Sequence, residues 1–373
     1  MIYFIIITLR ENPMKRIFVK AFSVTNLGDD LFVKILCERY PDHRFYISAL
    51  EEHDRAFQTI PNLTVFNLSS RKGKWIHRFQ KWGKKIGLNI EFLYDAQVYI
   101  GGSIFIEFHD PITYHGYFKN LYSTKTIQNI PYYILGANFG PYYTENFLEK
   151  HKTYITYQVD DLCVRDKFSY ELFKELPQVR YAPDILCTLK LPTAEKKNMI
   201  LISCIFSDAR EEINAFDNDL YEKKMVDLCN YYIGQNKEIC LLSMCNYQQD
   251  QIMCHRICSH FQSNVSVVEY QGNIDEILQL FASAEYIISS RFHAMILGWL
   301  AKTPVFPLYY SNKTLNVILD YGFKGSYTNI NDFHALSCQE IDNNRQTQYI
   351  FDIEPLAADA SNQFQVLDRF LNT

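Results

Sequence analysis

Short apolar runs alternate with stretches of helical periodicity along most of this sequence. The apolar runs are rich in β-branched and aromatic residues, and such alternation is typical of parallel sheets whose strands are joined by crossover helices. In the first half, the pattern predicts strands at residues 17–21, 44–48, 63–66, 97–100, 132–135 and 162–165. In the second half, it predicts strands at residues 199–205, 238–242, 265–269, 286–289 and 304–308.

A polar, lysine-rich segment at residues 190–198 interrupts this alternation, which starts again after it. The chain of 373 residues also exceeds what one hydrophobic core usually organises. We therefore expect an α/β protein with two Rossmann-like domains, residues 14–190 and 191–373, that face each other across a cleft.

The two ends of the chain also allow predictions. Residues 1–13 contain an apolar stretch without the basic region and cleavage site of a signal peptide. We expect the fold to begin at Met14 and residues 1–13 to be an extension without an assigned function. The final helical pattern, residues 357–371, is expected to cross back onto the first domain.

Composition and charge narrow the class of protein. Asp and Glu number 42 against 37 Lys and Arg, so the formal charge is -5 and nothing points to a nucleic-acid partner. No apolar run approaches the roughly 18 residues of a membrane-spanning helix. The 10 Cys residues lie mostly within apolar runs, which is typical of reduced thiols in a cytoplasmic protein rather than of a secreted disulfide framework.

Ligands of such folds bind where the carboxyl ends of parallel strands meet helix N-termini. Segments 23–30, 101–103, 136–141 and 289–294 stand at predicted strand ends and are expected to converge on one cleft. The glycines of the second and third segments let the backbone approach a ligand closely, although tight turns explain them equally well. Neither segment has the G-x-G-x-x-G spacing of dinucleotide-binding proteins.

Arg291 and His293 stand between a predicted strand and an apolar helix. There, free backbone N–H groups and the helix dipole favour an anion. A guanidinium suits a carboxylate or phosphate, and an imidazole exchanges a proton near neutral pH. In the alternative interpretation, Arg291 pairs with a neighbouring carboxylate and His293 merely caps the helix.

Arg165 stands at the carboxyl end of another predicted strand. The alternative here is a local ion pair with Asp166 or Glu171. Two arginines and one histidine, all at strand ends, together predict a site for a small compound that bears both a carboxylate and a phosphate.

At this point the motifs resemble those of the polysaccharide pyruvyl transferase family. The blocks that carry the resemblance are S-R-F-H-A at 290–294, P-V-F-P-L-Y-Y-S-N-K at 304–313, N-x-G-D-D at 26–30, G-A-N-F-G-P at 136–141, V-R-D-x-x-S at 164–169 and A-P-D at 182–184. The resemblance extends from about Asn26 to about Lys313. The family often has three glycines where this chain has Gly101-Gly102-Ser103, and a more glycine-rich turn at 136–141. Both departures bear on acceptor choice.

The resemblance implies a fold similar to GT-B glycosyltransferases and the transfer of a pyruvyl unit from phosphoenolpyruvate to a sugar. The product would be a cyclic pyruvate ketal on a hexose of a bacterial surface polysaccharide or its precursor, with release of phosphate. Matched residue by residue, the family's donor-binding arginines fall on Arg165 and Arg291, and its catalytic histidine falls on His293. The two guanidiniums would also offset charge as the phosphate leaves.

Further residues are assigned to the two substrates. We expect Ser290, Phe292 and Lys313 to belong to the donor site. On the opposite domain, we expect Asn26, Asp29, Gly102 and Asn138 to bind the acceptor. The scheme requires no cofactor and no metal ion.

Segment 71–86 contains a second feature that concerns the acceptor. Residues 71–85 contain seven Lys or Arg and no acid, and an aromatic stripe at helical spacing runs between the basic residues. Such a helix could lie on an anionic membrane surface, which suits an acceptor carried on a lipid diphosphate. The alternative is an ordinary domain helix that packs its stripe on the sheet, and nucleic acid is the least favoured partner.

A cluster of Cys and His residues invites a metal interpretation. Cys254 and Cys258 share a helix face, and Cys245, His255 and His260 lie nearby in sequence. A zinc site would need two further ligands in the right geometry, and no C-x-x-C pair is present. Core thiols and surface imidazoles are therefore the favoured interpretation.

Two other functions stay open at this stage. The chain could be a GT-B glycosyltransferase in which Arg291 and Lys313 bind the diphosphate of a nucleotide sugar. It could also be a non-catalytic scaffold of polymer assembly, although a scaffold has no need of Arg165, Arg291 and His293 together.

Overall fold

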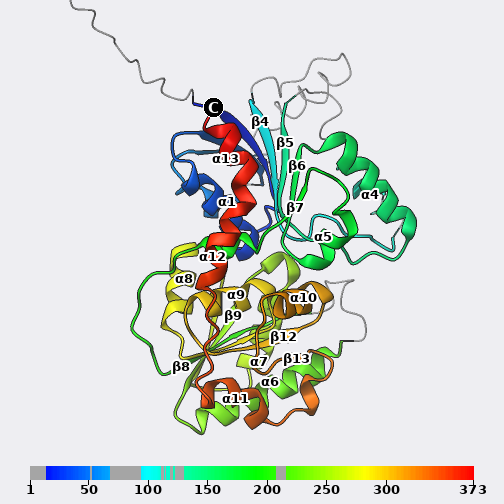
Figure 1. Ribbon diagram of the computed structural model, residues 1–373. Coiled ribbons are helices and arrows are strands. Elements are labelled where there is room, and N and C mark those ends of the chain that lie inside the picture. Colours follow the sequence, from blue (N-terminus) through cyan, green and yellow to red (C-terminus); the bar gives the residue numbers. More distant parts are fainter. Residues whose placement is uncertain are drawn as a thin grey trace, which may run out of the picture.

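The computed structural model describes residues 14–50, 53–67, 94–110, 113, 115–117, 121, 130–206 and 216–373. These residues form two α/β domains, one above the other in Figure 1, each built on its own parallel sheet. The expectations for residues 1–13 and 71–86 fall on residues outside the described ones.

The N-terminal domain is built on a seven-stranded sheet with the order β3-β2-β1-β4-β5-β6-β7, in which every pair of neighbours is parallel. Its strands are β1 (Arg16–Lys20), β2 (Arg44–Ala49), β3 (Leu63–Asn67), β4 (Ala96–Ile100), β5 (Tyr132–Ala137), β6 (Asp161–Val164) and β7 (Val179–Tyr181). Its described helices are α1 (Leu27–Arg39), η2 (Arg55–Phe57), α4 (Glu145–Gln158), α5 (Lys167–Phe173) and η4 (Ile185–Thr188).

The C-terminal domain repeats this plan with six parallel strands in the order β10-β9-β8-β11-β12-β13. They are β8 (Met199–Ser203), β9 (Glu238–Ser243), β10 (Val265–Glu269), β11 (Tyr286–Ser289), β12 (Val305–Tyr309) and β13 (Thr328–Asn329). Its described helices are α6 (Asn218–Ile233), η5 (Asn246–Gln248), α7 (Asp250–Cys258), α8 (Ile274–Ser283), α9 (Phe292–Leu300), α10 (Asn312–Asp320), η6 (Phe333–Ala335) and α11 (Cys338–Gln346).

Each sheet reverses its direction of growth once, between β1 and β4 and between β8 and β11. Such reversals open a crevice at the carboxyl ends of the strands. Central strands such as β5 and β8 are buried along their whole length, as expected for a parallel sheet with both faces covered. The expected class of two parallel-sheet α/β domains is confirmed.

Every strand that the apolar pattern predicts is present, and the bounds differ by at most two residues. The edge strands β7 and β13 were not predicted. They comprise 3 and 2 residues, which is too short for an alternating pattern to stand out from a loop. Residues 189–198, between η4 and β8, have no helix or strand.

The C-terminal segment returns from the second domain to the first through α12 (Glu354–Ala360), η7 (Ser361–Phe364) and α13 (Gln365–Leu371), drawn in red in Figure 1 beside α1. On α13, Asp368 accepts hydrogen bonds from both Arg39 (2.8 and 3.0 Å) and Tyr40 (2.7 Å). The buried side chain of Gln363 donates to the carbonyl of Ala182 at 2.7 Å. This return of the chain to the N-terminal domain is therefore fixed by specific polar contacts.

Direct contacts also join the two domains beside α1. The hydroxyl of Tyr270, after β10, donates to the buried carboxylate of Asp30 at 2.7 Å. In the same turn of α1, the backbone N–H of Leu27 donates to the carbonyl of Met244 at 3.2 Å. The amino end of α1 is thus held by two separate segments of the C-terminal domain.

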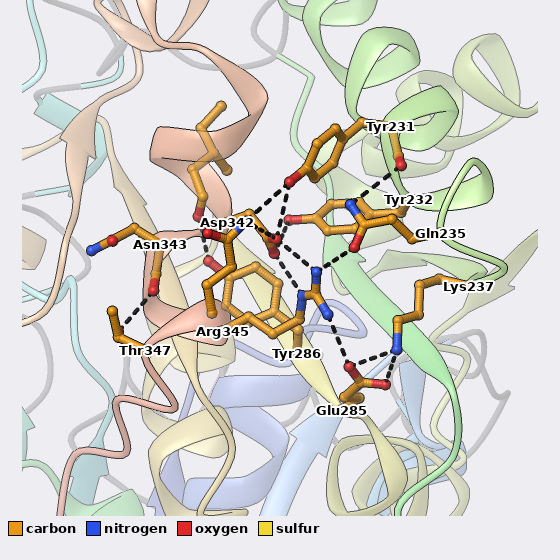
Figure 2. A network of polar contacts seen from close by, with 12 residues as sticks. Tyr231, Tyr232, Gln235, Lys237, Glu285, Tyr286, Asp342, Asn343, Arg345 and Thr347 are labelled. Atoms are coloured by element: carbon orange, nitrogen blue, oxygen red, sulfur yellow. Dashed lines mark hydrogen bonds and ion pairs between the residues drawn. The ribbon is translucent and has the colours of Figure 1, made fainter.

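A polar network fixes α11 to α6 and to the amino ends of β9 and β11 (Figure 2). Arg345 donates two hydrogen bonds of 2.6 Å to the buried carboxylate of Asp342 and one of 3.2 Å to Glu285. Glu285 in turn accepts from Lys237, and the hydroxyl of Tyr232 donates to Asp342 at 3.0 Å. Breaking a buried ion pair by removing one partner is strongly destabilising, because it leaves an uncompensated buried charge.

We predict that Arg345→Met lowers the free energy of unfolding by about 3 kcal/mol, because it leaves the carboxylate of Asp342 buried without its cation. The control is Lys302→Met, which removes the exposed ion pair with Glu354 and should cost about 1 kcal/mol or less. Urea unfolding of both variants measures the difference. Equal losses in the two variants would contradict the structural role of the network.

We also predict a pH effect at the domain interface. Burial raises the pKa of Asp30 well above its usual value, against the opposing effect of the hydrogen bond from Tyr270. The native state then binds a proton that the unfolded state releases near pH 3.9, so the free energy of unfolding falls as the pH rises from about 4 to the raised native pKa. Asp30→Asn keeps an acceptor for Tyr270 and removes this titration.

The measurement is urea unfolding of the wild type and Asp30→Asn at a series of pH values. The variant should gain stability relative to the wild type as the pH rises through that window. A difference between them that stays constant with pH would show that Asp30 does not titrate in the native state.

Candidate active site

A cleft of about 680 Å³ lies between the two domains at the carboxyl ends of both sheets. The N-terminal domain contributes residues that follow β1, β4, β5 and β6, and the C-terminal domain contributes residues that follow β9, β11 and β12. All four segments expected to converge contribute to the lining: 23–30, 101–103 and 289–294 supply several residues each, and 136–141 supplies Pro141.

Arg165, directly after β6, is buried at the floor of this cleft. Its Nη1 donates to the carboxylate of Asp184 at 2.9 Å, and its Nη2 donates to the side-chain oxygen of Asn138 at 2.7 Å. The guanidinium also lies over the ring of Phe292, 4.2 Å from the ring centroid. The local pairing considered from sequence is not made, because Asp166 instead caps α5 and accepts from the backbone N–H of Ser169.

His293, in the first turn of α9, reaches this guanidinium from the other domain. Its Nε2 lies 3.4 Å from Nη1 of Arg165 and 3.8 Å from the carboxylate of Asp184. The edge of the imidazole meets the ring of Phe32 on α1, with the ring centroids 5.2 Å apart. The cap position of α9 is held by Arg291, so His293 is not the helix cap.

Two glycines provide the space that these side chains occupy. A Cβ at Gly28 would lie 1.7 Å from Nδ1 of His293. A Cβ at Gly102 would lie 2.5 Å from Nη2 of Arg165. Any larger residue at either position would therefore displace a side chain of the site.

Asp184 is the buried carboxylate that joins the cluster. Burial by itself raises its pKa, but nearby His293 and the charge of Arg165 outweigh this effect, so the pKa lies below the ordinary value. Asp184 therefore stays ionised at neutral pH and can orient both neighbours. Asp184 stands in the A-P-D block of the sequence, and no role was predicted for it there. Its position soon after β7 was the missing signal, since that short strand was not recognised.

Asp29 faces the same cluster from the first turn of α1. Burial raises its pKa, and the positive charges of His293, Arg165 and Lys313 oppose this effect without cancelling it. A carboxyl with a raised pKa in a cleft suits proton exchange nearer to neutral pH. Asn26, also in the cleft lining, caps α1 by accepting from the backbone N–H of Gly28 at 3.1 Å.

Arg291 lines the cleft but already has a carboxylate partner, as the alternative interpretation expected. Its Nε donates to Asp250 at 2.8 Å, and its Nη1 donates to the side chain of Gln248. Asp250 also accepts from the backbone N–H of Cys245 at 3.2 Å. Arg291 thus holds the short helix η5 against the site, and sequence reasoning did not identify Asp250 or Gln248.

The other expected site residues divide into two groups. Phe292, Gly102 and Lys313 line the cleft, and Nζ of Lys313 donates across it to the hydroxyl of Ser103 at 3.0 Å. Ser290 and Asn138 do not line it. Ser290 is buried and shares a hydrogen bond with the hydroxyl of Tyr221 at 2.8 Å, and Asn138 supports Arg165 from behind.

Two general features of the chain bear on its partners. Within the described residues, no three His, Cys, Asp or Glu side chains are grouped so that they could hold a metal ion. There, His255 pairs with Glu269 and His260 with Glu222, each at 2.8 Å. None of the helices in the described ranges combines the length and the apolar character that crossing a membrane requires.

Comparison with known proteins agrees with this fold. The chain is similar to HepE from Anabaena in complex with UDP and glucose, with a TM-score of 0.53, 12% identity, and coverage of 96% of this chain and 100% of that one. It is also similar to UDP-GlcNAc 2-epimerase from Neisseria meningitidis bound to UDP-GlcNAc, with a TM-score of 0.60, 11% identity, and coverage of 96% and 100%. At such identities the likeness shows the fold alone, which is that of GT-B glycosyltransferases and epimerases.

The family follows from the sequence itself. The family model described as polysaccharide pyruvyl transferase matches residues 26–312, so the chain belongs to this family, as its motifs predicted. Among curated proteins, it is 23% identical over 254 residues to the amylovoran biosynthesis protein AmsJ from Erwinia amylovora. That match spans 61% of this chain and 60% of the length of AmsJ.

We predict that Gly28→Ala displaces the imidazole of His293 and lowers the free energy of unfolding by about 1–3 kcal/mol, the usual cost of overpacking. The displacement should appear in NMR spectra as a shift of the His293 ring resonances, assigned by their loss in His293→Ala. The control is Gly116→Ala, since a Cβ there would meet nothing within 4 Å. Unchanged His293 resonances in Gly28→Ala would contradict the close contact.

Proposed function

We propose that this protein transfers a pyruvyl unit from phosphoenolpyruvate to a saccharide during the assembly of a polysaccharide. The observation that carries the proposal is the meeting of Arg165 and His293 from opposite domains, 3.4 Å apart, in a cleft that Asp29 and Lys313 also line. Two cations, one imidazole and one carboxyl with a raised pKa are what an anionic enol donor and a hydroxyl acceptor need.

The donor would lie between the two domains. Its carboxylate and phosphate suit the guanidinium of Arg165, the ammonium of Lys313 and the free N–H groups at the start of α9, with Phe292 beneath. Arg291 would act mainly on the geometry of this site, because its guanidinium is shared with Asp250 and Gln248. No metal ion and no cofactor enter the proposed scheme.

The proposed reaction has two additions at the same carbon. His293 protonates C3 of the enol, and C2 becomes an oxocarbenium-like centre that the first acceptor hydroxyl attacks. The C–O bond to phosphate then breaks, and a second hydroxyl adds to C2 to close the cyclic ketal. The two acceptor hydroxyls release two protons. One replaces the proton that His293 gave to C3, and the other leaves with the phosphate. Asp29 is the proposed acceptor of a hydroxyl proton. General acid catalysis of this kind contributes about 10²–10⁴ in rate.

The proposed acceptor is a hexose of a bacterial surface polysaccharide or of its lipid-diphosphate precursor, at the cytoplasmic face of a membrane. Similarity to a protein named for amylovoran biosynthesis supports a role in polymer assembly. The proposed membrane contact through residues 71–86 rests on the sequence alone.

A second candidate is a glycosyltransferase that uses a nucleotide sugar. It is favoured by the shared fold with HepE, a protein solved with UDP and with UDP-glucose. In that case UDP would occupy the cleft and phosphoenolpyruvate would not compete for it.

We predict that phosphoenolpyruvate raises the melting temperature of the purified protein, whereas UDP or inorganic phosphate alone does not. With β-galactosides or N-acetylhexosaminides as acceptors, the protein should also release phosphate from phosphoenolpyruvate. Mass spectrometry should show that the acceptor gains the mass of one pyruvate less one water. A shift with UDP only, and no phosphate release with any acceptor, would favour the glycosyltransferase.

We further predict that His293→Ala abolishes transfer, with a loss of about 10²-fold or more, and still binds phosphoenolpyruvate. Arg165→Ala should instead weaken donor binding by about 2–5 kcal/mol, because it removes a buried charge. Calorimetric titration of the donor separates the two effects, and His255→Ala, with its exposed ring, is the control. A fully active His293→Ala variant would overturn its role as the general acid.

A further inference from the structure

The cleft also contains aromatic side chains that the proposed donor chemistry does not use. We propose that they form two stacking platforms for the acceptor, and that the acceptor is an oligosaccharide of at least two sugars rather than a single hexose. This inference rests on the proposed function, because it identifies the substrate class of the same cleft.

The first platform is formed by Phe22 and Tyr247. Phe22 follows β1 and Tyr247 belongs to η5, so the two domains contribute one ring each. The rings meet edge to face, with centroids 5.9 Å apart, and both line the cleft. Tyr247 is 62% exposed and Phe22 is 45% exposed, so each ring leaves much of its apolar surface open to a ligand.

The position of Tyr247 is fixed by the centre of the site. Tyr247 lies between Asn246 and Gln248 in η5, and Gln248 accepts a hydrogen bond from Arg291. Asp250 binds both Arg291 and the backbone N–H of Cys245, so it closes the other end of the same turn. The Phe22–Tyr247 platform is therefore coupled to the donor side of the cleft rather than being a loose surface ring.

The second platform is formed by His109 and Tyr143. Their rings are stacked, with centroids 4.1 Å apart and an angle of 23° between the planes, and both line the cleft. The buried carboxylate of Glu107 accepts from the backbone N–H groups of Tyr143 and Thr144. Glu107 also accepts from the hydroxyl of Thr144. These hydrogen bonds fix the backbone that carries Tyr143.

The chemistry of these platforms fits sugars. A hexose has apolar C–H faces that cover an aromatic ring and hydroxyl groups around its edge that need hydrogen-bonding partners. Beside the rings, the cleft lining supplies the hydroxyls of Ser103 and Thr113, the amide of Asn26 and the carboxyl of Asp29. Phe22, Tyr143 and Tyr247 bear no positive charge that would bind a long polyanion, which favours a neutral saccharide chain.

The length of the acceptor follows from the number of platforms. One hexose covers one ring pair, and the two pairs line the same cleft of about 680 Å³ as Arg165 and His293. That volume lies within the range of about 300–1,000 Å³ that encloses a drug-sized ligand. The cleft therefore has room for the small donor together with more than one sugar.

The test uses the full chain and a series of mono-, di- and trisaccharides that end in β-galactose or an N-acetylhexosamine. Their dissociation constants are measured by calorimetry, without the donor, for the wild type, Tyr143→Ala and Tyr247→Ala. In the wild type, affinity should rise with chain length, and each Ala variant should lose about three- to tenfold for the longer saccharides. Tyr143→Phe and Tyr247→Phe keep the ring and should keep the affinity.

The matched control is Tyr157→Ala, which removes an exposed tyrosine on α4 outside the cleft lining and should change nothing. Equal affinity for mono- and trisaccharides, or unaltered binding in both Ala variants, overturns the proposal. Loss of UDP binding in Tyr247→Ala, with no saccharide bound by the wild type, overturns it in favour of a nucleotide. Saccharide binding without phosphate release from phosphoenolpyruvate would retain the platforms and refute the proposed reaction.

Discussion

The buried ion pair between Arg165 and Asp184 is the constraint on which the rest of the site depends. A carboxylate without exposure to water needs a cation and further donors, and Asp184 has Arg165 at 2.9 Å with His293 close by. Because His293 belongs to the other domain, the full cluster exists only in this arrangement of the two domains. The return of α13 onto α1, and the contact of Tyr270 with Asp30, preserve that arrangement far from the chemistry.

The backbone near the cluster has adapted to these side chains. Gly28 opens the first turn of α1 to the imidazole of His293, and Gly102 opens the loop after β4 to the guanidinium of Arg165. In both places the glycine is needed for the room that a missing Cβ leaves, not for an unusual backbone angle. The N-x-G-D-D block and the glycine turn at 101–102 therefore have a physical explanation in the contacts of the site.

Much of the site could be predicted from the sequence because parallel strands bring their carboxyl ends to one edge. This rule correctly brought Arg165, Arg291, His293 and Asp29 to one cleft. It could not assign their partners. Asp184 lies 19 residues from Arg165 along the chain and Asp250 lies 41 residues from Arg291, so only the tertiary fold brings these carboxylates to the guanidiniums. The aromatic platforms escaped prediction for the same reason, since their rings come from separate loops.

The two arginines of the cleft are not equivalent. Arg165 is paired with the single carboxylate of Asp184, its other side-chain partner is the neutral amide of Asn138, and His293 lies beside it. Arg291 has two hydrogen bonds to one buried carboxylate and a third to Gln248. An anion near either arginine meets a buried carboxylate, Asp250 or Asp184, but an anion near Arg165 would also meet the basic groups His293 and Lys313. In the proposed reaction, the donor therefore depends on Arg165 for charge and on Arg291 for the position of η5.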